Sequence, residues 1–579
     1  MTICGIKLTH DGSIAVIDDR KLLFCIELEK IANNPRYTAI EDTAIISDIL
    51  QREGLKAADI DEFVVDGWGG YDADALAIQP RLSIGDTHNL LQYRDEGRLG
   101  QLAVAQYQER TMQSDVLEAC NFSGLSIKGE SYPYASYLHV TGHIAGAYCS
   151  SPFSKDRQDA YVLVWDGGMY PRLYFVDGSR GRVENLGPLF LLIGNIYTIF
   201  SQHFGPFKVR GQFAKDDLSV AGKVMAYVAT GELRKELFAD FDYVYGNFYD
   251  KPMGFANVFA NEFKKRLRGG EYRDEDILLS FHWYLQELLL QKLDKKIERF
   301  GRRSENLCIA GGCALNIKWN SAIRNMGLFR RVYVPPFPND SGSAVGMACA
   351  AMMKATGQCG LDWSVYSGPK VGDTPAAPGW QAVSCPVEEL ARLLHATKEP
   401  VVVLHGRAEL GPRALGNRSI LADPTSEVMK DVLNEVKDRE SYRPVSPICL
   451  EHRAGGIFEP GTPDPYMLFD HLVRKEWVAK IPAVCHLDGT ARLQTVNERE
   501  NAFIFSLLTE YDRLFGMPLL CNTSANYKNA GFFPDAASAS EWGRVNYIWC
   551  EGTLYSRPGE VHFSKQAQRN SQLNQVPEL

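Results

Sequence analysis

Apolar residues in the first third of the chain fall into short runs that are separated by turn residues, a pattern typical of β-strands. Residues 3–28 predict a strand, a corner at Thr9–Ser13, a second strand, an Asp-Asp-Arg-Lys turn and a third strand. Residues 160–177 repeat the first part of this arrangement, with Asp166-Gly167-Gly168 at the corner. Two antiparallel meanders with Asp-Gly corners predict a duplicated fold with a ligand cleft between its halves.

Two later corners join a strand to a helix. The apolar run Leu307–Ala310 leads into Gly311–Asn316, and Val332–Pro336 leads into Asp340-Ser341-Gly342-Ser343 and an alanine-rich helix. Such corners bind phosphates and nucleosides in α/β proteins. Glycine also occurs at these turns for geometry alone, so this signal is weak by itself.

A turn-rich stretch over residues 357–384 has no helical period and predicts a linker. After it, the pattern predicts a helix at Val387–Ala396, a buried strand at Val401–Leu404 and a helix at Val428–Val436. Alternating strands and helices indicate an α/β fold. We therefore predict an α/β protein with domains at residues 1–356 and 385–579.

Composition narrows the class of protein. The 579 residues are 45% apolar and 23% charged, with a net charge of −9, which is ordinary for a globular protein and gives no general attraction for nucleic acid. The 13 cysteines form no CxxC pair, which indicates a reducing compartment. We find no signal peptide and no apolar run of about 18 residues. The expectation is a cytoplasmic protein without membrane contact; the sequence indicates no oligomeric state.

The stretch after the strand Val401–Leu404, residues 406–419, contains three arginines and three glycines. Glycine lets backbone N–H groups approach a phosphate, and the arginine fork matches phosphate oxygens. Further polar clusters follow at 437–444, 492–495 and 522–524. Solvated surface loops are the alternative. Several clusters, each beside a strand or turn, favour a polyphosphate site.

A second constellation suggests a metal. His139 and His143 are four residues apart, which places both rings on one face of a helix. A bare HxxxH is more often two unrelated histidines, but Asp166 ends a buried strand and Asp340 sits at a strand-to-helix corner, where a carboxylate needs a partner. This donor set suits Fe(II), Zn or Mn, with an open position for Lewis-acid chemistry. His10, at the first corner, is either a base facing the cleft or a turn residue.

Taken in order along the chain, these motifs resemble the O-carbamoyltransferase family of antibiotic and nodulation-factor biosynthesis. The resemblance covers nearly the whole chain. Its strongest element is Gly411–Ser419. The other matching segments are His10-Asp11, His139 with His143, Asp166-Gly167-Gly168, Gly222-Lys223-Val224-Met225, Gly311–Asn316, Asp340, Lys437-Asp438-Arg439-Glu440, Arg443-Pro444 and Asn522-Thr523-Ser524.

The resemblance implies a fold and an activity. The first domain would be actin-like, a duplicated RNase H-like ATPase domain with a metal, and the second would be YrdC-like. The second domain would convert carbamoyl phosphate and ATP, with Mg, into carbamoyl adenylate. The first would pass the carbamoyl group to a hydroxyl of a small-molecule natural product. The chain would then be an ATP-dependent O-carbamoyltransferase.

The resemblance also implies residue roles. Phosphates and carbamate would contact Arg413, Arg418, Lys437, Arg443, Arg492, Asn522 and Ser524, with Arg413 and Lys437 catalytic. His10 would be catalytic at the transfer step, and the nucleotide in the first domain would contact Lys223, Gly311, Gly312 and Asn316. Iron or a similar metal would bind His139, His143, Asp166 and Asp340.

Two departures from the family pattern, Glu27–Ile31 and the segment 197–217, leave the acceptor open. Two other functions remain as alternatives. A tRNA threonylcarbamoyl-type modification enzyme is disfavoured by the acidic net charge. A non-catalytic nucleotide-binding scaffold is disfavoured by the histidine pair, because a scaffold has no need of open metal ligands.

Overall fold

The computed structural model describes residues 1–68, 89–109, 111–248, 255–267 and 272–557. The chain forms two compact units. The first contains Met1–Ile26 and Ala39–Trp363, and the second contains Glu27–Thr38 together with the chain from Ser364 onward. The predicted linker at 357–384 is thus divided between the units. The segment Glu27–Thr38 packs with the second unit, whereas the sequence pattern had placed it inside the first domain.

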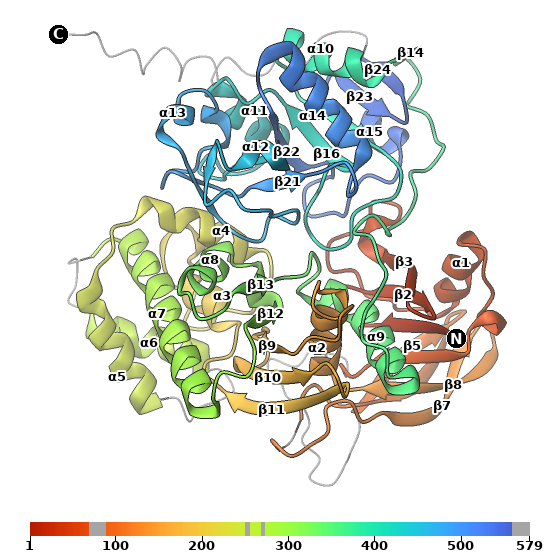
Figure 1. The fold of residues 1–579 in the computed structure, drawn as a ribbon, viewed down its shortest axis with the longest axis vertical. Coiled ribbons are helices and arrows are strands. Elements are labelled where there is room, and N and C mark those ends of the chain that lie inside the picture. The colour runs from red at the N-terminus through yellow and green to blue at the C-terminus, as the bar shows by residue number, and fades with distance from the viewer. Residues whose placement is uncertain (69–88, 110, 249–254, 268–271, 558–579) are drawn as a thin grey trace. The chain divides into compact units, whose positions relative to one another are not determined.

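Two sheets of the first unit repeat one topology (Figure 1). In each, a three-stranded antiparallel meander is followed by two strands that run parallel to the first strand of the meander. The predicted meanders are confirmed. The first sheet has the order β3-β2-β1-β4-β8-β7 and the second β11-β10-β9-β12-β13, with β1 Thr2–Lys7, β2 Ser13–Asp18, β3 Lys21–Glu27, β4 Glu62–Asp66, β7 Cys120–Ile127, β8 Glu130–Tyr137, β9 Ala160–Val164, β10 Arg172–Asp177, β11 Arg182–Pro188, β12 Asn306–Ala310 and β13 Arg331–Tyr333.

A pair of buried helices joins the two sheets. Helix α9 (Ser343–Thr356) packs on β1, β2 and β4, α2 (His139–Ser150) packs on β9 and β12, and the two helices pack on each other. They approach closely because glycines face each other: a Cβ on Gly346 would lie 1.9 Å from the carbonyl oxygen of Gly142. This contact fixes the N-terminal ends of both helices, where the candidate metal ligands lie.

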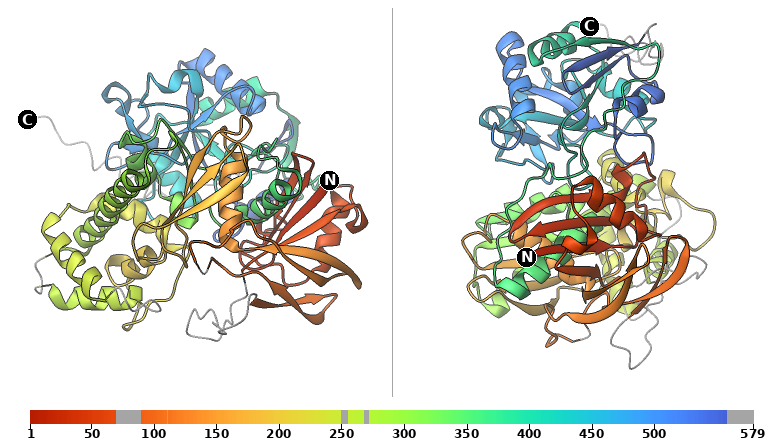
Figure 2. Two further views of the ribbon diagram at one scale, coloured as in Figure 1. Left: turned by 60° about the horizontal axis from the view of Figure 1, so that its bottom comes forward. Right: turned by 90° about the vertical axis from the view of Figure 1, so that its right-hand side faces the viewer.

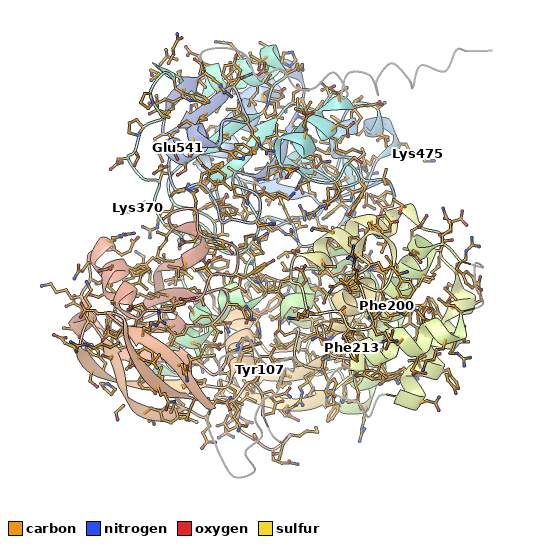
Figure 3. All side chains as sticks on the ribbon, turned by 180° about the vertical axis from the view of Figure 1, so that it is seen from behind. Tyr107, Phe200, Phe213, Lys370, Lys475 and Glu541 are labelled. Carbon is orange, nitrogen blue, oxygen red and sulfur yellow. The ribbon has the colours of Figure 1, made fainter. Side chains whose placement is uncertain are left out.

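Several helices of the first unit lie close together (Figure 2), and aromatic side chains pack between them. Phe200 of α3 stacks on Phe281 of α7 at 3.9 Å between ring centroids, and Phe241 stacks on Phe263 at 4.4 Å. Figure 3 marks Phe200 within these helices, while Phe213, on the loop before α4, is 75% exposed. The elements are α3 Ile196–Ser201, α4 Val220–Tyr227, α5 Phe238–Phe248, α6 Phe255–Arg266, α7 Asp274–Phe300 and α8 Ile317–Asn325, with α1 Ala44–Arg52 and the hairpin β5 Asn89–Asp95 and β6 Arg98–Val104 elsewhere in the unit.

The second unit is built on an eight-stranded mixed sheet of order β14-β24-β23-β15-β16-β22-β17-β21. Its centre is apolar and buried, as the run Val401–Leu404 predicts. The strands are β14 Gln381–Ser384, β15 Val401–Leu404, β16 Arg418–Ala422, β17 Ser446–Leu450, β21 Gln494–Val496, β22 Leu519–Ser524, β23 Tyr547–Cys550 and β24 Thr553–Ser556, with a small sheet of β18 Phe458–Glu459, β19 His471–Val473 and β20 Thr490–Ala491. The helices are α10 Val387–Thr397, α11 Val428–Val436, α12 Glu451–Ala454, α13 Lys475–Val478, α14 Ala502–Phe515 and α15 Ala536–Trp542.

The arginine-rich stretch has a defined place in this sheet. Strands β15 and β16 are antiparallel, with Leu404 opposite Arg418, so residues 405–417 form the connection between them. We call this connection, with Arg418, the arginine loop. The α/β class is confirmed in both units. Every helix in the described part of the chain is too short or too polar to cross a bilayer.

The glycine contact between α2 and α9 can be tested by substitution. Gly346→Ala should lower the free energy of unfolding by about 1–3 kcal/mol, because its methyl group would collide with the Gly142 carbonyl. Thermal or urea unfolding measures the change. The matched control is Gly246→Ala on α5, where a Cβ meets no atom within 4 Å and alanine favours the helix. Equal losses for the two variants would contradict the packing described here.

Candidate active site

The two histidines of α2 lie on one face of the helix, as predicted. Strand β8 leads directly into α2, which begins at His139. The Nε2 atoms of His139 and His143 are 3.2 Å apart, and both side chains are buried. At this distance the two Nε2 atoms could bind the same metal ion.

Two carboxylates from other elements reach the same position. Asp340 lies in the turn before α9, and its Oδ1 is 3.4 Å from the Nε2 of both histidines. Asp166 follows β9, and its Oδ2 is 4.0 Å from Nε2 of His139. All four candidate ligand atoms lie within 4.8 Å of one another. Tetrahedral ligands at bonds of about 2.0–2.2 Å are about 3.3–3.6 Å apart. The separations among His139, His143 and Asp340 are close to this range, and that between His139 and Asp166 is longer.

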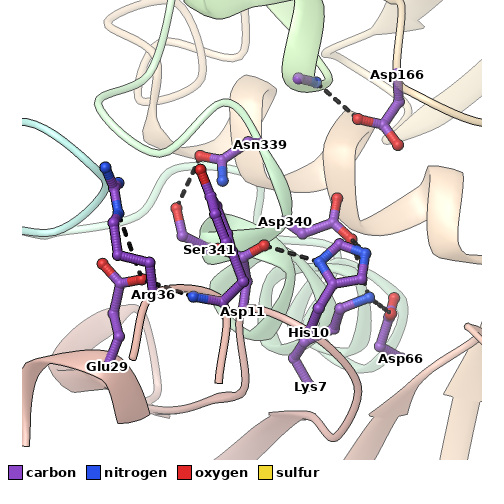
Figure 4. Close-up of polar contacts among 12 residues, drawn as sticks. Lys7, His10, Asp11, Glu29, Arg36, Asp66, Asp166, Asn339, Asp340 and Ser341 are labelled. Atoms are coloured by element: carbon purple, nitrogen blue, oxygen red, sulfur yellow. Dashed lines mark hydrogen bonds and ion pairs between the residues drawn. The ribbon is translucent and has the colours of Figure 1, made fainter. Parts of the chain in front are cut away.

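A further carboxylate orients His139. Asp66, at the end of β4, holds both carboxylate oxygens 3.0 Å from Nδ1 of His139. A hydrogen on Nδ1 donates to Asp66, which leaves the Nε2 lone pair directed into the cluster. Lys7, which is fully buried, links Asp66 at 2.8 Å to Asp340 at 3.0 Å. Figure 4 shows Lys7 between these two carboxylates.

Asp166 is held from another side. Its Oδ2 accepts the hydroxyl hydrogen of Tyr107 at 2.6 Å, and its Oδ1 accepts the backbone N–H of Gly312 at 2.7 Å. The Tyr107 ring also stacks on His139, with 4.7 Å between centroids. The positions of Asp166 and His139 are therefore set by the same residue.

The charges of this cluster do not balance internally. Burial disfavours the imidazolium, yet Asp66 and Asp340 raise the pKa of His139 to about 9. In spite of burial, the cationic neighbours hold the pKa values of Asp66 and Asp340 below the usual range. With neutral imidazoles, the three carboxylates and the Lys7 ammonium leave two negative charges. A divalent cation bound at Nε2 would replace the proton and balance that charge, so the residues fit the predicted metal.

His10 borders this cluster. Its Nδ1 is 2.8 Å from Oδ2 of Asp11, its Nε2 is 3.5 Å from Oδ2 of Asp340, and its side chain is 26% exposed (Figure 4). Burial opposes the charged ring, while the hydrogen bond to Asp11 raises the pKa of His10 above its ordinary value. One ring nitrogen is thus oriented by a carboxylate, and the other faces the metal ligands.

The predicted nucleotide-binding residues of the first unit occupy three places. Gly311 has a φ of 88°, and a Cβ there would lie 2.4 Å from the carbonyl oxygen of Trp165. Gly312 donates to Asp166, as described above. Asn316 caps α8 through Oδ1, while its Nδ2 is buried without a hydrogen-bond partner. Lys223 lies on α4. A nucleotide contact for these residues stays a prediction.

In the second unit, the arginine loop folds around one buried carboxylate. Oε1 of Glu409 accepts backbone N–H bonds from Leu415 and Asn417 at 2.7 Å and from Arg418 at 3.1 Å. The guanidinium of Arg418 donates to the carbonyl oxygens of three loop residues, His405, Gly406 and Asn417, and to that of Pro369. Arg418 is 1% exposed. These bonds hold the backbone of the loop, and the phosphate contact of Arg418 stays a prediction.

Lys437 is bound to the turn after β22. Its ammonium donates to the backbone carbonyls of Ser524 and Asn526, each at 2.8 Å, and to the side chain of Asn526. An ammonium has three donors, and all three are engaged in this arrangement. The catalytic and phosphate-binding role of Lys437 stays a prediction.

Two neutral residues from the predicted site line this region. Asn522 donates to the carbonyl oxygen of Ala414 at 3.0 Å and to Gln494 at 2.8 Å, and its Oδ1 is buried without a hydrogen-bond partner. The Ser524 hydroxyl donates to Asn526 at 2.6 Å. These contacts connect β22 to the arginine loop and to Asn526, which also accepts a hydrogen bond from Lys437.

The remaining arginines repel one another. Burial, and then Arg492, Arg36 and Arg443, lower the pKa of Arg413 well below its usual range. Burial and neighbouring arginines also lower the pKa of Arg492 to about 10 and that of Arg439 to about 9. The Nε atoms of Arg413 and Arg439 are buried without hydrogen-bond partners. We call Arg36, Arg413, Arg439, Arg443 and Arg492 the arginine cluster; its charge fits an anion with several oxygens.

Sequence reasoning missed four of these residues. Asp66 ends a buried strand, the same signal that singled out Asp166, and Lys7 is a charge inside an apolar strand. Arg439 lies in a quoted motif but was given no role. Arg36 carried no local signal, because its neighbours in the arginine cluster are hundreds of residues away in sequence.

Comparison with known proteins identifies the family of this chain. The family model described as carbamoyltransferase N-terminus matches residues 2–349, and that described as carbamoyltransferase C-terminus matches residues 391–556. The chain therefore belongs to the carbamoyltransferase family of enzymes, as its motifs predicted.

Its relatives include proteins of two kinds. Nodulation protein U of Rhizobium tropici is 48% identical, with 96% of each chain covered, and nodulation protein U of Sinorhizobium fredii is 46% identical, with 96% of this chain and 99% of that protein covered. The 3'-hydroxymethylcephem-O-carbamoyltransferase of Streptomyces clavuligerus is 33% identical, with 96% of this chain and 99% of that protein covered.

The metal fit can be tested without an activity assay. His139→Ala should abolish metal retention, because it removes the nitrogen that both carboxylates surround. Asp66→Asn should weaken metal binding about 10–100-fold, because it loosens the orientation of a ligand and keeps the ligand itself. Elemental analysis after anaerobic purification, and competition with a chelator, measure both effects. His452→Ala, on the exposed start of α12, serves as the control. Unchanged metal content in His139→Ala would contradict the assignment.

Proposed function

We propose that this protein transfers a carbamoyl group from carbamoyl phosphate, through carbamoyl adenylate made with ATP and Mg, to a hydroxyl of a small-molecule natural product. The observation that carries the proposal is the pairing, in one carbamoyltransferase-family chain, of a buried His/His/Asp/Asp cluster and a cluster of arginines that lower one another's pKa. The proposal extends to the fold: repeated sheet topology supports an actin-like first unit, and the second unit would be YrdC-like.

The arginine cluster suits the first half of this reaction. Adenylation concentrates negative charge on phosphoryl oxygens, and preorganised guanidinium groups stabilise that charge where water is scarce. Burial and neighbouring arginines hold the pKa of Arg413 well below its usual range, and an arriving phosphate would relieve its repulsion from Arg492 and Arg443. Arg413, Arg443 and Arg492 would hold the phosphate and carbamate groups, while Asn522 and Ser524 line the loop beside them.

The histidine cluster suits the second half. A metal held by His139, His143, Asp166 and Asp340, with iron(II), zinc or manganese as candidates, would polarise the carbamoyl carbonyl, which is a poor electrophile. His10 would accept the proton of the acceptor hydroxyl, with Asp11 orienting its other ring nitrogen. Asp66 and Lys7 would keep the ligands in place.

The names of the relatives bear on the acceptor. One kind of relative is named for a hydroxymethyl group on a cephem, and the other for nodulation. The nodulation relatives are the more similar, at 45–48% identity against 33%. We therefore propose that the acceptor is a molecule of the nodulation-factor class rather than a cephem. A net charge of −9 makes a tRNA acceptor the weaker alternative.

Isotope exchange between pyrophosphate and ATP, dependent on carbamoyl phosphate, tests the proposal. Arg413→Ala should reduce this exchange at least about 100-fold, because it removes the guanidinium that would stabilise the negative charge on the phosphoryl oxygens. Arg513→Ala, an exposed arginine paired with Glu510, is the control and should keep the wild-type rate. Absence of exchange in the wild-type protein would refute the adenylate route.

The division of labour between the units gives a separate test. His10→Gln should keep pyrophosphate exchange and bound metal at wild-type levels, since it alters neither the arginine cluster nor a metal ligand. Carbamoyl transfer to the acceptor, followed by product mass, should fall about 100-fold or more, as for loss of a general base. Transfer at the wild-type rate would remove His10 from the mechanism.

A further inference from the structure

The second unit contains a short segment that the chain supplies from its N-terminal end. Residues 27–38, which we call the strap, leave β3 and pack with the unit that otherwise begins at Ser364. The strap carries three buried charged residues, Glu27, Glu29 and Lys30, and the half-buried Arg36. Its contacts with the arginine loop suggest a role beyond connecting two units.

Lys30 is tied to the backbone of the arginine loop. Its ammonium, 1% exposed, donates to the carbonyl oxygen of Glu409 at 2.5 Å, to that of Gly411 at 2.8 Å and to Oε1 of Glu27 at 2.7 Å. All three donors are used. Glu27 completes the contact, because the same Oε1 accepts the backbone N–H of Gly411 at 2.8 Å.

These bonds hold the loop close to Arg413. On the N-terminal side, Gly411 is fixed by Glu27 and Lys30. On the C-terminal side, Leu415 is fixed by the Glu409 carboxylate. Arg413 is therefore the centre of a short span that is anchored two residues before and two residues after it. Movement of either anchor would move the guanidinium.

The rest of the strap docks against the loop after β22. Pro35 pairs with Ala530, and the backbone N–H of Arg36 donates to Asn529 at 2.9 Å. The approach is so close that a Cβ on Gly531 would lie 1.8 Å from the carbonyl oxygen of Glu29. The backbone on both sides of Arg36 is thus held within the second unit.

This docking brings Arg36 into the arginine cluster. Its charge lowers the pKa of Arg413, Arg443 and Lys437, so it lies within electrostatic range of all three. Within the strap, Arg36 forms an ion pair with Glu29, with 3.9 Å between Nε and Oε2 (Figure 4).

We propose that the strap is part of the carbamoyl phosphate site: Arg36 binds the phosphate, and Lys30 is a positioning residue for Arg413. This inference rests on the proposed function, since it assigns strap residues to the same anion. The C-terminal unit without residues 27–38 would lack one phosphate-binding arginine and the anchor of another.

Binding of inorganic phosphate and carbamoyl phosphate to the full-length protein, by calorimetry, tests the role of Arg36. Arg36→Ala should weaken binding of both at least about tenfold, the usual effect of losing a charge-assisted hydrogen bond, with an unchanged melting temperature. Arg36→Lys should recover part of the affinity. Arg513→Ala should bind like the wild type. Wild-type affinity in Arg36→Ala would overturn its assignment.

Lys30 needs a test that separates positioning from stability. Lys30→Met leaves Glu27 as an unpaired buried carboxylate and should lower both the melting temperature and phosphate affinity. The double variant Glu27→Gln/Lys30→Met removes both charges, so most of the melting temperature should return. Phosphate affinity should stay at least about fivefold weaker, because the Glu409 and Gly411 carbonyls still lack their donor. Recovery of both properties would show that Lys30 only stabilises the fold.

The failure of this inference is distinguishable from that of the proposed function. If the wild type shows carbamoyl-phosphate-dependent pyrophosphate exchange while Arg36→Ala and the double variant bind phosphate normally, the strap assignment is wrong and the function stands. If the wild type binds neither anion and shows no exchange, the proposed function is wrong and the strap assignment falls with it.

Discussion

Three carboxylates and two imidazoles share a buried position in the first unit, and one lysine is too little positive charge to balance them. Burying ions is costly unless a partner of opposite charge is supplied. The second unit has the opposite difficulty, because several half-buried arginines lower one another's pKa. The proposed ligands, a cation in one site and an anion in the other, would supply the missing charge. The chemistry proposed for the two sites follows from this need.

Rigid surroundings keep these like charges together. In the first unit the backbones of α2 and α9 touch at glycines, so the histidines and Asp340 cannot separate without breaking a helix contact. In the second unit, buried charged side chains hold the backbone in place through hydrogen bonds. Glu409 accepts from backbone N–H groups, and Arg418, Lys437 and Lys30 donate to backbone carbonyl oxygens.

Much of the fold and part of the site could be predicted from sequence. The meanders, the strand Val401–Leu404 and the helix Val428–Val436 have local patterns that tertiary packing preserves. His139, His143, Asp166 and Asp340 could be singled out because helical spacing and strand ends are local signals. The backbone contacts of Arg418 and Lys437 could not be foreseen, since an arginine that holds a loop and one that binds a phosphate look alike in a glycine-rich segment. The strap was missed because its contacts span almost 400 residues.

The metal content of the wild-type protein, purified without oxygen and without added metal, tests the central claim most directly. If buried negative charge defines the first site, the protein should contain about one iron, zinc or manganese ion per chain, and a strong chelator should remove that ion together with carbamoyl transfer. Carbamoyl transfer at the full rate by protein free of all three metals would contradict the account.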